Sequence, residues 1–327
     1  MSKDKSGKPG VVREGKLMPL APSTGASKQG WHSIVDFLRC PEEYRLRHLV
    51  GLKQPQEATP DPLGVGMLVH YGVAKWQEAG HPMWDEALDA KVGRWLEEAR
   101  AAQRLPIRTQ AEREARWYVM CYAKHWGMKA KPRMVGVEYE LGPTSILPGR
   151  NEAFLARTAR LDGVGYFPEA NGALVIQEMK TTSVGVNDAL QEYTLHGQPL
   201  LQALLWKLAP QGEAKHGPIA GVLLDVIHKR YDSNSDGMRI VPTHGRVLIP
   251  VPQYSLEWFA EVLALHLREA SMVTAESKAR RNPTACTRLV GRMRKPCEFR
   301  NLCQYGPGVL SQFVNRDGKT PSASVLT

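Results

Sequence analysis

Apolar side chains recur along this chain in two periods, and their alternation predicts helices packed on a β-sheet. Spacings of three and four residues predict helices at 33–50, 64–80, 84–104, 110–128, 188–209 and 254–277. Short runs rich in β-branched residues predict strands at 135–141, 154–167, 173–181, 219–228 and 246–251. Pro41 lies inside the first helical stretch, so that helix should kink or divide there.

The strand predicted at 173–181 begins with apolar residues but ends with charged ones. It reads Leu174-Val-Ile-Gln-Glu-Met-Lys180, and because side chains alternate along a strand, Glu178 and Lys180 share one face. Buried charges are unfavourable unless they are paired or bound to a metal. The end of this strand is therefore a candidate site, and Asp162 on the preceding strand supplies a second acid.

The loop between these two strands decides whether the two acids can meet. A two-residue turn would place Asp162 and Glu178 on opposite faces of the sheet. A five-residue loop, 168–172, pairs Phe167 with Ala173 and sets Asp162 opposite Glu178. We predict the five-residue loop or an equivalent bulge, because one metal ion needs both carboxylates on one face.

These residue types suit a metal-dependent phosphodiesterase. Asp162 and Glu178 offer hard oxygen ligands for Mg²⁺ or Mn²⁺, and the Met179 backbone carbonyl is a possible third. A bound metal polarises the scissile phosphate. Lys180 can orient the attacking water or stabilise the charge that develops on the phosphate.

Two other residues are weaker candidates on the residue pattern alone. His70 could add a nitrogen ligand that favours Mn²⁺, but a histidine on a helix more often has no such role. Glu138 ends a predicted strand and equally suits a solvated position.

Composition indicates a protein with a substantial core and no membrane span. The chain has 327 residues, of which 43% are hydrophobic, enough for one large domain or two small ones. No apolar run approaches the ~20 residues of a membrane helix. The N-terminus lacks the apolar segment of a signal peptide. We therefore expect a soluble, cytoplasmic protein.

The net charge of +10 is concentrated in two segments. Residues 1–30 hold six Lys/Arg and two acids, and residues 276–300 hold eight Lys/Arg and two acids. Localised positive charge suits a phosphate backbone. The first segment, rich in Lys, Gly, Ser and Pro, is predicted to be a disordered tail that serves solubility, whereas the second accompanies three cysteines.

Together, these motifs resemble the PD-(D/E)XK nuclease superfamily, specifically its RecB-like branch. Asp162 followed by Glu178-Met-Lys-Thr-Thr182 resembles the acid and Glu-x-Lys-Thr-Ser motifs, and Gly66-Met-Leu-Val-His70 resembles Gly-x-x-x-His. Gln198-Pro-Leu-Leu-Gln202 resembles the Gln-x-x-x-Tyr motif, with Gln202-Ala-Leu-Leu-Trp206 as the alternative frame. The strand at 221–229 is similar to one frequent in phage-encoded members.

The resemblance covers about residues 31–305 and implies an α/β fold. That fold is a restriction-endonuclease-like core, a central mixed β-sheet flanked by helices, with N- and C-terminal segments joined by a metal cluster. The expected organisation is a basic tail at 1–30, one nuclease domain at 31–305 with a helical insertion at 84–128, and a polar tail at 306–327. In this scheme His70 completes the metal site and Gln198 or Gln202 orients Lys180 or the DNA.

The chain has five cysteines, of which Cys121 lies among aromatic residues and is predicted to be a core residue. Structural disulfides are rare in cytosolic proteins, so the other four, Cys40, Cys286, Cys297 and Cys303, suggest a metal site. Four thiolates suit a [4Fe–4S] cluster or Zn²⁺, and the third alternative is that the thiols bind no metal.

The Cys297-x₅-Cys303 spacing resembles the cysteine tail of the iron–sulfur branch, which includes CRISPR-associated exonucleases. In that branch one cysteine near the N-terminus joins three near the C-terminus, and the gap between Cys286 and Cys297 is wider here than is usual. The implied [4Fe–4S] cluster, in the segment 286–303, would fasten this segment to the first helix. The basic residues within the gap either grip phosphates or form a solvated loop.

The leading interpretation is a metal-dependent DNA nuclease that acts on single strands or ends in recombination, repair or processing, with a protein partner possible. The alternatives are a catalytically silent DNA-binding subunit of a recombination complex, an RNA-directed nuclease, and a zinc-stapled scaffold in which Glu178 and Lys180 form a structural ion pair.

Overall fold

The computed structural model describes residues 30–55, 61–102, 106–183, 185–194, 196–229, 241–276, 279–282, 286–290, 293–315, 319 and 321. The basic tail expected at 1–30 thus lies almost wholly outside the described residues. Among the helices that are described, none combines the length and the apolar character needed to cross a bilayer.

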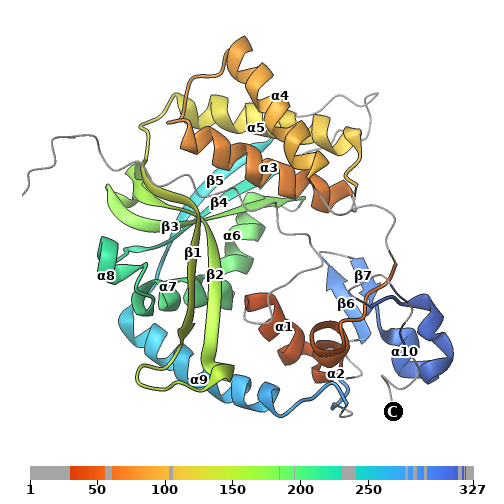
Figure 1. Cartoon of the computed structure of the whole chain (residues 1–327). Coiled ribbons are helices and arrows are strands. Elements are labelled where there is room, and N and C mark those ends of the chain that lie inside the picture. Colours follow the sequence, from red (N-terminus) through yellow and green to blue (C-terminus); the bar gives the residue numbers. More distant parts are fainter. Residues whose placement is uncertain are drawn as a thin grey trace, which may run out of the picture.

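Five strands form a mixed sheet in the order β1-β2-β3-β4-β5 (Figure 1). Their bounds are Arg133–Ser145, Ala156–Phe167, Ala173–Thr182, Gly221–His228 and Thr243–Pro250. Neighbouring strands are antiparallel except β3 and β4, which are parallel. Parallel neighbours need a crossover connection. The connection from β3 to β4 contains the helices α6 (Val186–Thr194), α7 (Gly197–Leu208) and α8 (Glu213–His216). The sheet confirms the mixed α/β core predicted from the sequence.

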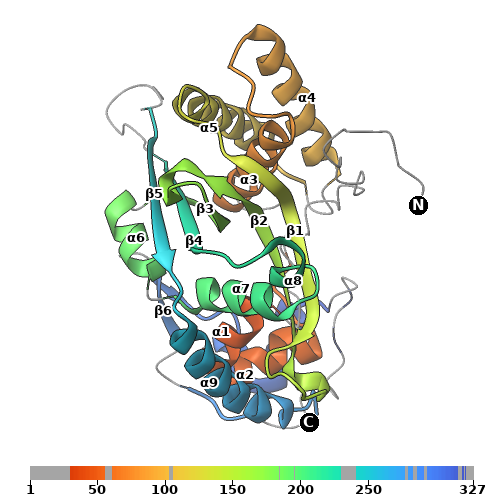
Figure 2. The same ribbon diagram turned by 90° about the vertical axis from the view of Figure 1, so that its left-hand side faces the viewer.

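Helices cover both faces of the sheet (Figures 1 and 2). On one face, α7 and α9 (Gln253–Ser271) pack their apolar residues against Ile176 and Val222 in the largest hydrophobic core. On the other, α3 (Asp61–Glu78), α4 (Glu86–Ala101) and α5 (Thr109–Gly127) form a helical layer whose core includes Met179 and Ile227. The alternation along β3 thus sends Ile176 and Met179 into different layers.

The first predicted helix is divided at Pro41, as expected. It forms α1 (Trp31–Arg39), α2 (Pro41–Tyr44) and the π-helical segment η1 (Arg45–Val50). The helix predicted at 188–209 is also divided, into α6 and α7. The break has a local cause, because the His196 ring accepts a hydrogen bond from the Gln198 N–H at 3.4 Å and so caps α7.

The C-terminal segment returns to the first helices (Figure 1). It contains the hairpin β6 (Thr287–Val290) and β7 (Met293–Pro296), which we did not predict, then α10 (Arg300–Tyr305) and η5 (Gly306–Gln312). Leu46 and Leu52 pack with Phe299 and Phe313 in a separate core. Apolar contacts therefore extend into the first part of the segment expected to be a polar tail from 306; residues 316–318, 320 and 322–327 lie outside the described chain.

A buried ion pair lies between the sheet and the α3–α5 layer. Asp225 on β4 is fully buried and accepts hydrogen bonds from Arg246 Nε (2.8 Å), the Tyr122 hydroxyl (2.6 Å) and Gln177 Nε2 (2.8 Å). The Arg246 guanidinium also lies 3.6 Å from the centre of the Trp126 ring. Burial alone lowers the pKa of Arg246, but Asp225, Tyr122 and Glu169 outweigh it and raise that pKa.

We predict that Arg246→Met lowers the free energy of unfolding by about 3–5 kcal/mol, because it leaves the Asp225 carboxylate buried without its cation. Urea unfolding measures this change. The double variant Asp225→Asn/Arg246→Met should recover at least half of the loss, since the amide keeps hydrogen-bonding atoms but no charge.

The matched control is Arg150→Met, because the Arg150 side chain is 54% exposed in its pair with Glu152. We expect that control to stay within about 0.5 kcal/mol of the wild type. An equal cost for Arg246→Met and Arg150→Met would contradict the role assigned to the buried pair.

Candidate active site

The hairpin of β2 and β3 has the register predicted from the sequence. Phe167 pairs with Ala173, and the pairing continues to Gly163 with Gln177. The loop has five residues, 168–172, and ends in two positions with positive φ, Asn171 (53°) and Gly172 (72°). Asp162 and Glu178 are the next positions in this register.

Asp162 lies where the β2–β3 ladder ends, and its side chain takes the place of a backbone partner. Its Oδ2 accepts a hydrogen bond of 2.7 Å from the Met179 N–H, and its Oδ1 lies 3.3 Å from His70 Nδ1. Burial would raise the pKa of Asp162, but His70, Lys180 and the Met179 N–H together hold it below its ordinary value. The residue is thus kept as a carboxylate beside the backbone of β3.

The Gly-x-x-x-His motif has a direct structural explanation. A Cβ atom at Gly66 would lie 3.1 Å from Thr181 Oγ1, so glycine allows α3 to approach the end of β3 closely. His70 follows one turn later on the same face of α3 and reaches Asp162. Burial lowers the pKa of His70, but the Asp162 carboxylate outweighs it, so the pKa lies above its ordinary value.

Glu178 is 3% exposed, and its carboxylate is held by three donors. Gln198 Nε2 donates to Oε1 at 2.7 Å, Gln202 Nε2 donates to Oε2, and Lys180 Nζ forms an ion pair with Oε1. Gln198 and Gln202 are four residues apart, so both project from one face of α7 over the strand. Both glutamines contact Glu178, and the expectation that one of them orients Lys180 or DNA stays a prediction.

Lys180 is held as a cation beside the two acids. Burial alone lowers its pKa, but Glu178, Tyr193 and Asp162 outweigh it and raise the pKa well above its ordinary value. Its ammonium lies 5.1 Å from the centre of the Tyr193 ring. We did not predict a role for Tyr193 from the sequence. The sequence pattern placed it only within the helix predicted at 188–209, which in the structure is divided into α6 and α7.

Glu138 adds a third acid to this neighbourhood. It lies on β1 between the pairs Val137–Gly163 and Tyr139–Leu161, and hence across from Asp162. Its φ of 50° is unusual for a residue other than glycine. Burial and the charge of Asp162 raise its pKa, against the effect of Arg160, which pairs with it at 3.0 Å.

The structure thus forms two contact groups joined by the backbone of Met179. His70 contacts Asp162 on one side, and Glu178 contacts Lys180 and both glutamines on the other. In the described part of the chain, no three His, Cys, Asp or Glu side chains surround one point as the ligands of a single ion would. Both oxygens of Glu178 instead contact Gln198, Gln202 and Lys180.

The donor set nevertheless fits a hard divalent cation. The N–H and C=O of one strand residue point to the same side, so the Met179 carbonyl faces the same edge as the N–H that holds Asp162. Two carboxylates, this carbonyl and one imidazole form a set of oxygen and nitrogen ligands typical of Mg²⁺ or Mn²⁺ sites.

Four of the five cysteines line one cavity between the first helices and the C-terminal segment. They are Cys40, Cys286, Cys297 and Cys303. The Cys297 N–H donates to the Cys286 carbonyl at 2.8 Å. Burial raises the pKa of the Cys303 thiol to about 11. Arg281 opposes this rise, whereas Glu42, Cys297 and Cys40 add to it. None of the five cysteines forms a disulfide, so no disulfide competes for these thiols.

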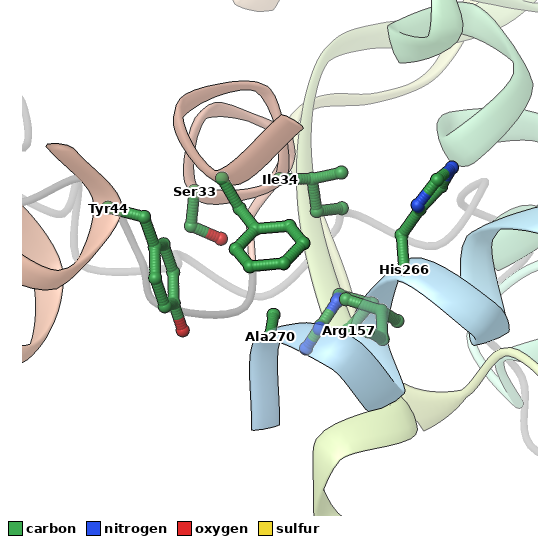
Figure 3. A pocket seen from close by; sticks show the side chains of 8 residues that line it. Ser33, Ile34, Tyr44, Arg157, His266 and Ala270 are labelled. Carbon is green, nitrogen blue, oxygen red and sulfur yellow. The ribbon is translucent and has the colours of Figure 1, made fainter. Parts of the chain in front are cut away.

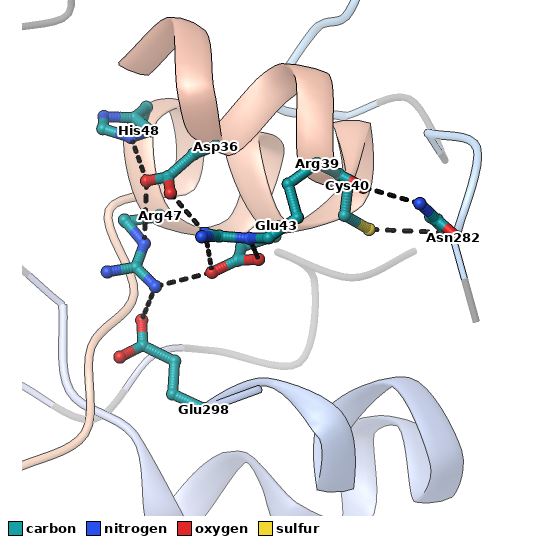
Figure 4. Close-up of polar contacts among 8 residues, drawn as sticks. All are labelled: Asp36, Arg39, Cys40, Glu43, Arg47, His48, Asn282 and Glu298. Carbon is teal, nitrogen blue, oxygen red and sulfur yellow. Dashed lines mark hydrogen bonds and ion pairs between the residues drawn. The ribbon is translucent and has the colours of Figure 1, made fainter. Parts of the chain in front are cut away.

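An ion-pair network beside the cavity joins both ends of the described chain (Figure 4). Arg47 Nη2 lies 2.8 Å from Glu43 and 2.9 Å from Glu298, and so connects η1 to the C-terminal segment. The Asn282 N–H donates to Cys40 Sγ at 3.5 Å. These contacts between protein groups hold α1 and η1 beside the C-terminal segment, next to the cavity that Cys40 and the C-terminal cysteines line.

Comparison with known proteins agrees with this geometry. The profile of the PD-(D/E)XK nuclease superfamily matches residues 32–304. The chain therefore belongs to the PD-(D/E)XK nuclease superfamily. No curated protein is similar enough in sequence to count as a relative.

We predict that Asp162→Asn lowers the pKa of His70 below its ordinary value, because the variant keeps the burial and loses the neighbouring negative charge. NMR titration of the imidazole in EDTA-treated protein measures it. In the wild type, the stabilisation from protonated His70 is complete below its ordinary pKa of about 6.5 and is lost as pH rises through the raised pKa.

Asp188→Asn, at an exposed position of α6, serves as the control and should leave the His70 titration unchanged. A His70 pKa that is the same in Asp162→Asn and in the wild type would rule out Asp162 as its partner.

Proposed function

We propose that this protein is a metal-dependent DNA nuclease that hydrolyses phosphodiester bonds at single strands or ends. The observation that carries the proposal is the hydrogen bond from the Met179 N–H to Asp162, which fixes one acid beside the strand that presents Glu178 and Lys180. Membership of the PD-(D/E)XK superfamily supports a metal-dependent nuclease in general terms.

Each residue has a distinct role in this proposal. Asp162, Glu178, the Met179 carbonyl and His70 hold the cation, which when bound supplies Lewis-acid stabilisation of the scissile phosphate. Lys180, kept protonated by its neighbours, orients the attacking water and stabilises developing charge on the phosphate. Gln198 and Gln202 position the Glu178 carboxylate rather than contacting the reacting atoms.

The preference for strands or ends draws on the RecB-like resemblance and on the layout of the helices. The layer formed by α4 and α5, within 84–128, would act as a wall beside the site, and the basic segment 276–300 would contact phosphates. We assign the enzyme to DNA recombination, repair or processing in a bacterial or phage-infected cytoplasm, with a protein partner. Five cysteines that form no disulfide suit such a reducing compartment.

The cysteine-lined cavity is proposed to hold a [4Fe–4S] cluster. Its support is that Cys40, Cys286, Cys297 and Cys303 line one cavity, although Cys40 is far from the others in sequence. A cluster carries its own iron and sulfide atoms between the thiolates, so its ligands stand farther apart than the four ligands of one zinc ion. Among the described residues, no three His, Cys, Asp or Glu side chains lie close enough to hold one ion, so the cavity does not present the compact ligand set that zinc needs.

We predict that the anaerobically purified protein cleaves end-labelled DNA with Mg²⁺ or Mn²⁺ and that Lys180→Ala reduces the rate by about 100-fold or more. The reason is the loss of the ammonium that pairs with Glu178 and lies near Asp162. Product ladders on single- and double-stranded DNA and on RNA measure substrate and polarity.

Lys207→Ala is the matched control, since Lys207 lies on α7 and bonds to Gln253 away from the acids. It should keep full activity. Metal-dependent cleavage at the wild-type rate in Lys180→Ala would contradict the assignment of Lys180 to the active site. DNA binding without cleavage by either protein would favour the catalytically silent subunit. Preferential cleavage of RNA would favour the RNA-directed nuclease.

A second prediction concerns the metal content. The anaerobic protein should contain about four irons per chain and absorb visible light as iron–sulfur proteins do. Cys303→Ser should lose most of the iron, whereas Cys121→Ser, a buried cysteine of α5 outside the cavity, should keep it. Stoichiometric zinc in place of iron would support the zinc alternative, and equal iron in both variants would show that the cavity does not bind it.

A further inference from the structure

A second cavity lies between α1, α2, β2 and α9, away from the acids and the cysteines (Figure 3). Its lining combines apolar side chains with one buried cation, Arg157. In Figure 3, Arg157 from β2 and Tyr44 from α2 approach the hollow from opposite sides, with Ala270 of α9 between them. The complete lining is Ser33, Ile34, Phe37, Tyr44, Arg157, His266, Leu267 and Ala270.

Arg157 is 7% exposed, yet among the described residues no carboxylate pairs with it. Its Nη1 donates to the neighbouring Ala156 carbonyl at 2.6 Å, while its Nε is buried without a partner. Burial lowers the pKa of this guanidinium to about 10. By contrast, the similarly buried Arg45 and Arg246 each hold a carboxylate.

A buried charge without a partner is strongly unfavourable, so a site of this kind favours an opposite charge from outside the chain. The Nε edge of a guanidinium presents parallel N–H groups that match two oxygens of one anion. The Tyr44 hydroxyl can donate a further hydrogen bond. The lining residue His266 lies 3.8 Å from Glu269, but that carboxylate is 62% exposed and does not contact Arg157.

The size of the cavity limits the ligand. The space open to the centre of a water molecule is about 10 Å³, roughly that of one water. One oxygen of an anion can therefore enter and accept from the buried Nε, while the rest of the group, with the second oxygen that the same guanidinium edge can bind, stays at the mouth.

We propose that this cavity is an anion site in which Arg157 binds a phosphate-type oxyanion. The phosphate has two sources, free inorganic phosphate or the backbone of a bound strand. Arg157 lies five residues before Asp162 on β2, about 17 Å along the strand, so a bound strand could reach both places. The anion site itself does not depend on the proposed nuclease activity; only the strand as its source does.

Thermal unfolding of the full-length protein tests the site. At equal ionic strength, 10 mM inorganic phosphate (about 100 times a Kd near 0.1 mM) should raise the melting temperature of the wild type above that in chloride by about 3 °C or more. Arg157→Met should show no such rise. Without phosphate this variant should melt no lower than the wild type, because it removes an unpaired buried charge.

The matched control is Arg150→Met, an exposed arginine, which should gain as much from phosphate as the wild type. Equal gains in the wild type and Arg157→Met would overturn the proposal, and so would no gain in either. If Arg157→Met does not fold, Arg157→Lys takes its place, because it keeps the charge and loses the parallel N–H edge. A rise in melting temperature with phosphate as large as that of the wild type would then overturn the bidentate site.

Binding of a single-stranded oligonucleotide in EDTA separates the two sources. If the phosphate belongs to the strand, Arg157→Met should weaken binding and reduce the salt dependence by about one phosphate contact, a slope change of about 0.7. If the source is free phosphate, oligonucleotide binding should be equal in the two proteins while the thermal difference remains. Both results support the anion site.

Discussion

Glu178 is almost fully buried within a β-sheet, and the arrangement around it follows from the need to satisfy its charge. Lys180, two residues along the same strand face, supplies the cation. The remaining donors, Gln198 and Gln202, have to come from a helix that crosses β3, and the crossover between the parallel strands β3 and β4 provides it. The position of α7 and the order of the central strands are thus tied to one carboxylate. Its neighbour Asp162 has other partners, the Met179 N–H and the His70 side chain.

The core of this arrangement could be predicted from the sequence because it depends on local patterns. Strand alternation put Glu178 and Lys180 on one face, and the parity of the 168–172 loop set the register that brings Asp162 to them. Other features depend on tertiary contacts that leave no local pattern. The contacts of both glutamines with Glu178 and the approach of Tyr193 to Lys180 belong to this second kind. His196 followed by Gly197 could have indicated the break between α6 and α7. The helical spacing of apolar residues continues across these two positions, so we predicted one helix.

The structure uses two different means to join distant segments. The sheet and its helical layers are joined by apolar packing, with one buried ion pair between Asp225 and Arg246. The first helices and the C-terminal segment are joined by a smaller core and by the ion pairs of Arg47 with Glu43 and Glu298. Ion pairs whose side chains are partly exposed, such as Arg47 with Glu298, are individually weak. The second junction is therefore the one that a group bound by the four cysteines would strengthen most.

The distance in sequence between Cys40 and Cys303 has a consequence for biosynthesis. All five strands of the sheet lie between these residues, so a ribosome has made the whole sheet before it makes the last cysteine. At ordinary elongation rates the interval is roughly 15–50 s. During that time Cys40 is present without the three thiols that complete its cavity, and the apolar surface of Leu46 and Leu52 is uncovered. The cavity can therefore close only after the sheet has been synthesised, and whatever fills it arrives later than the sheet.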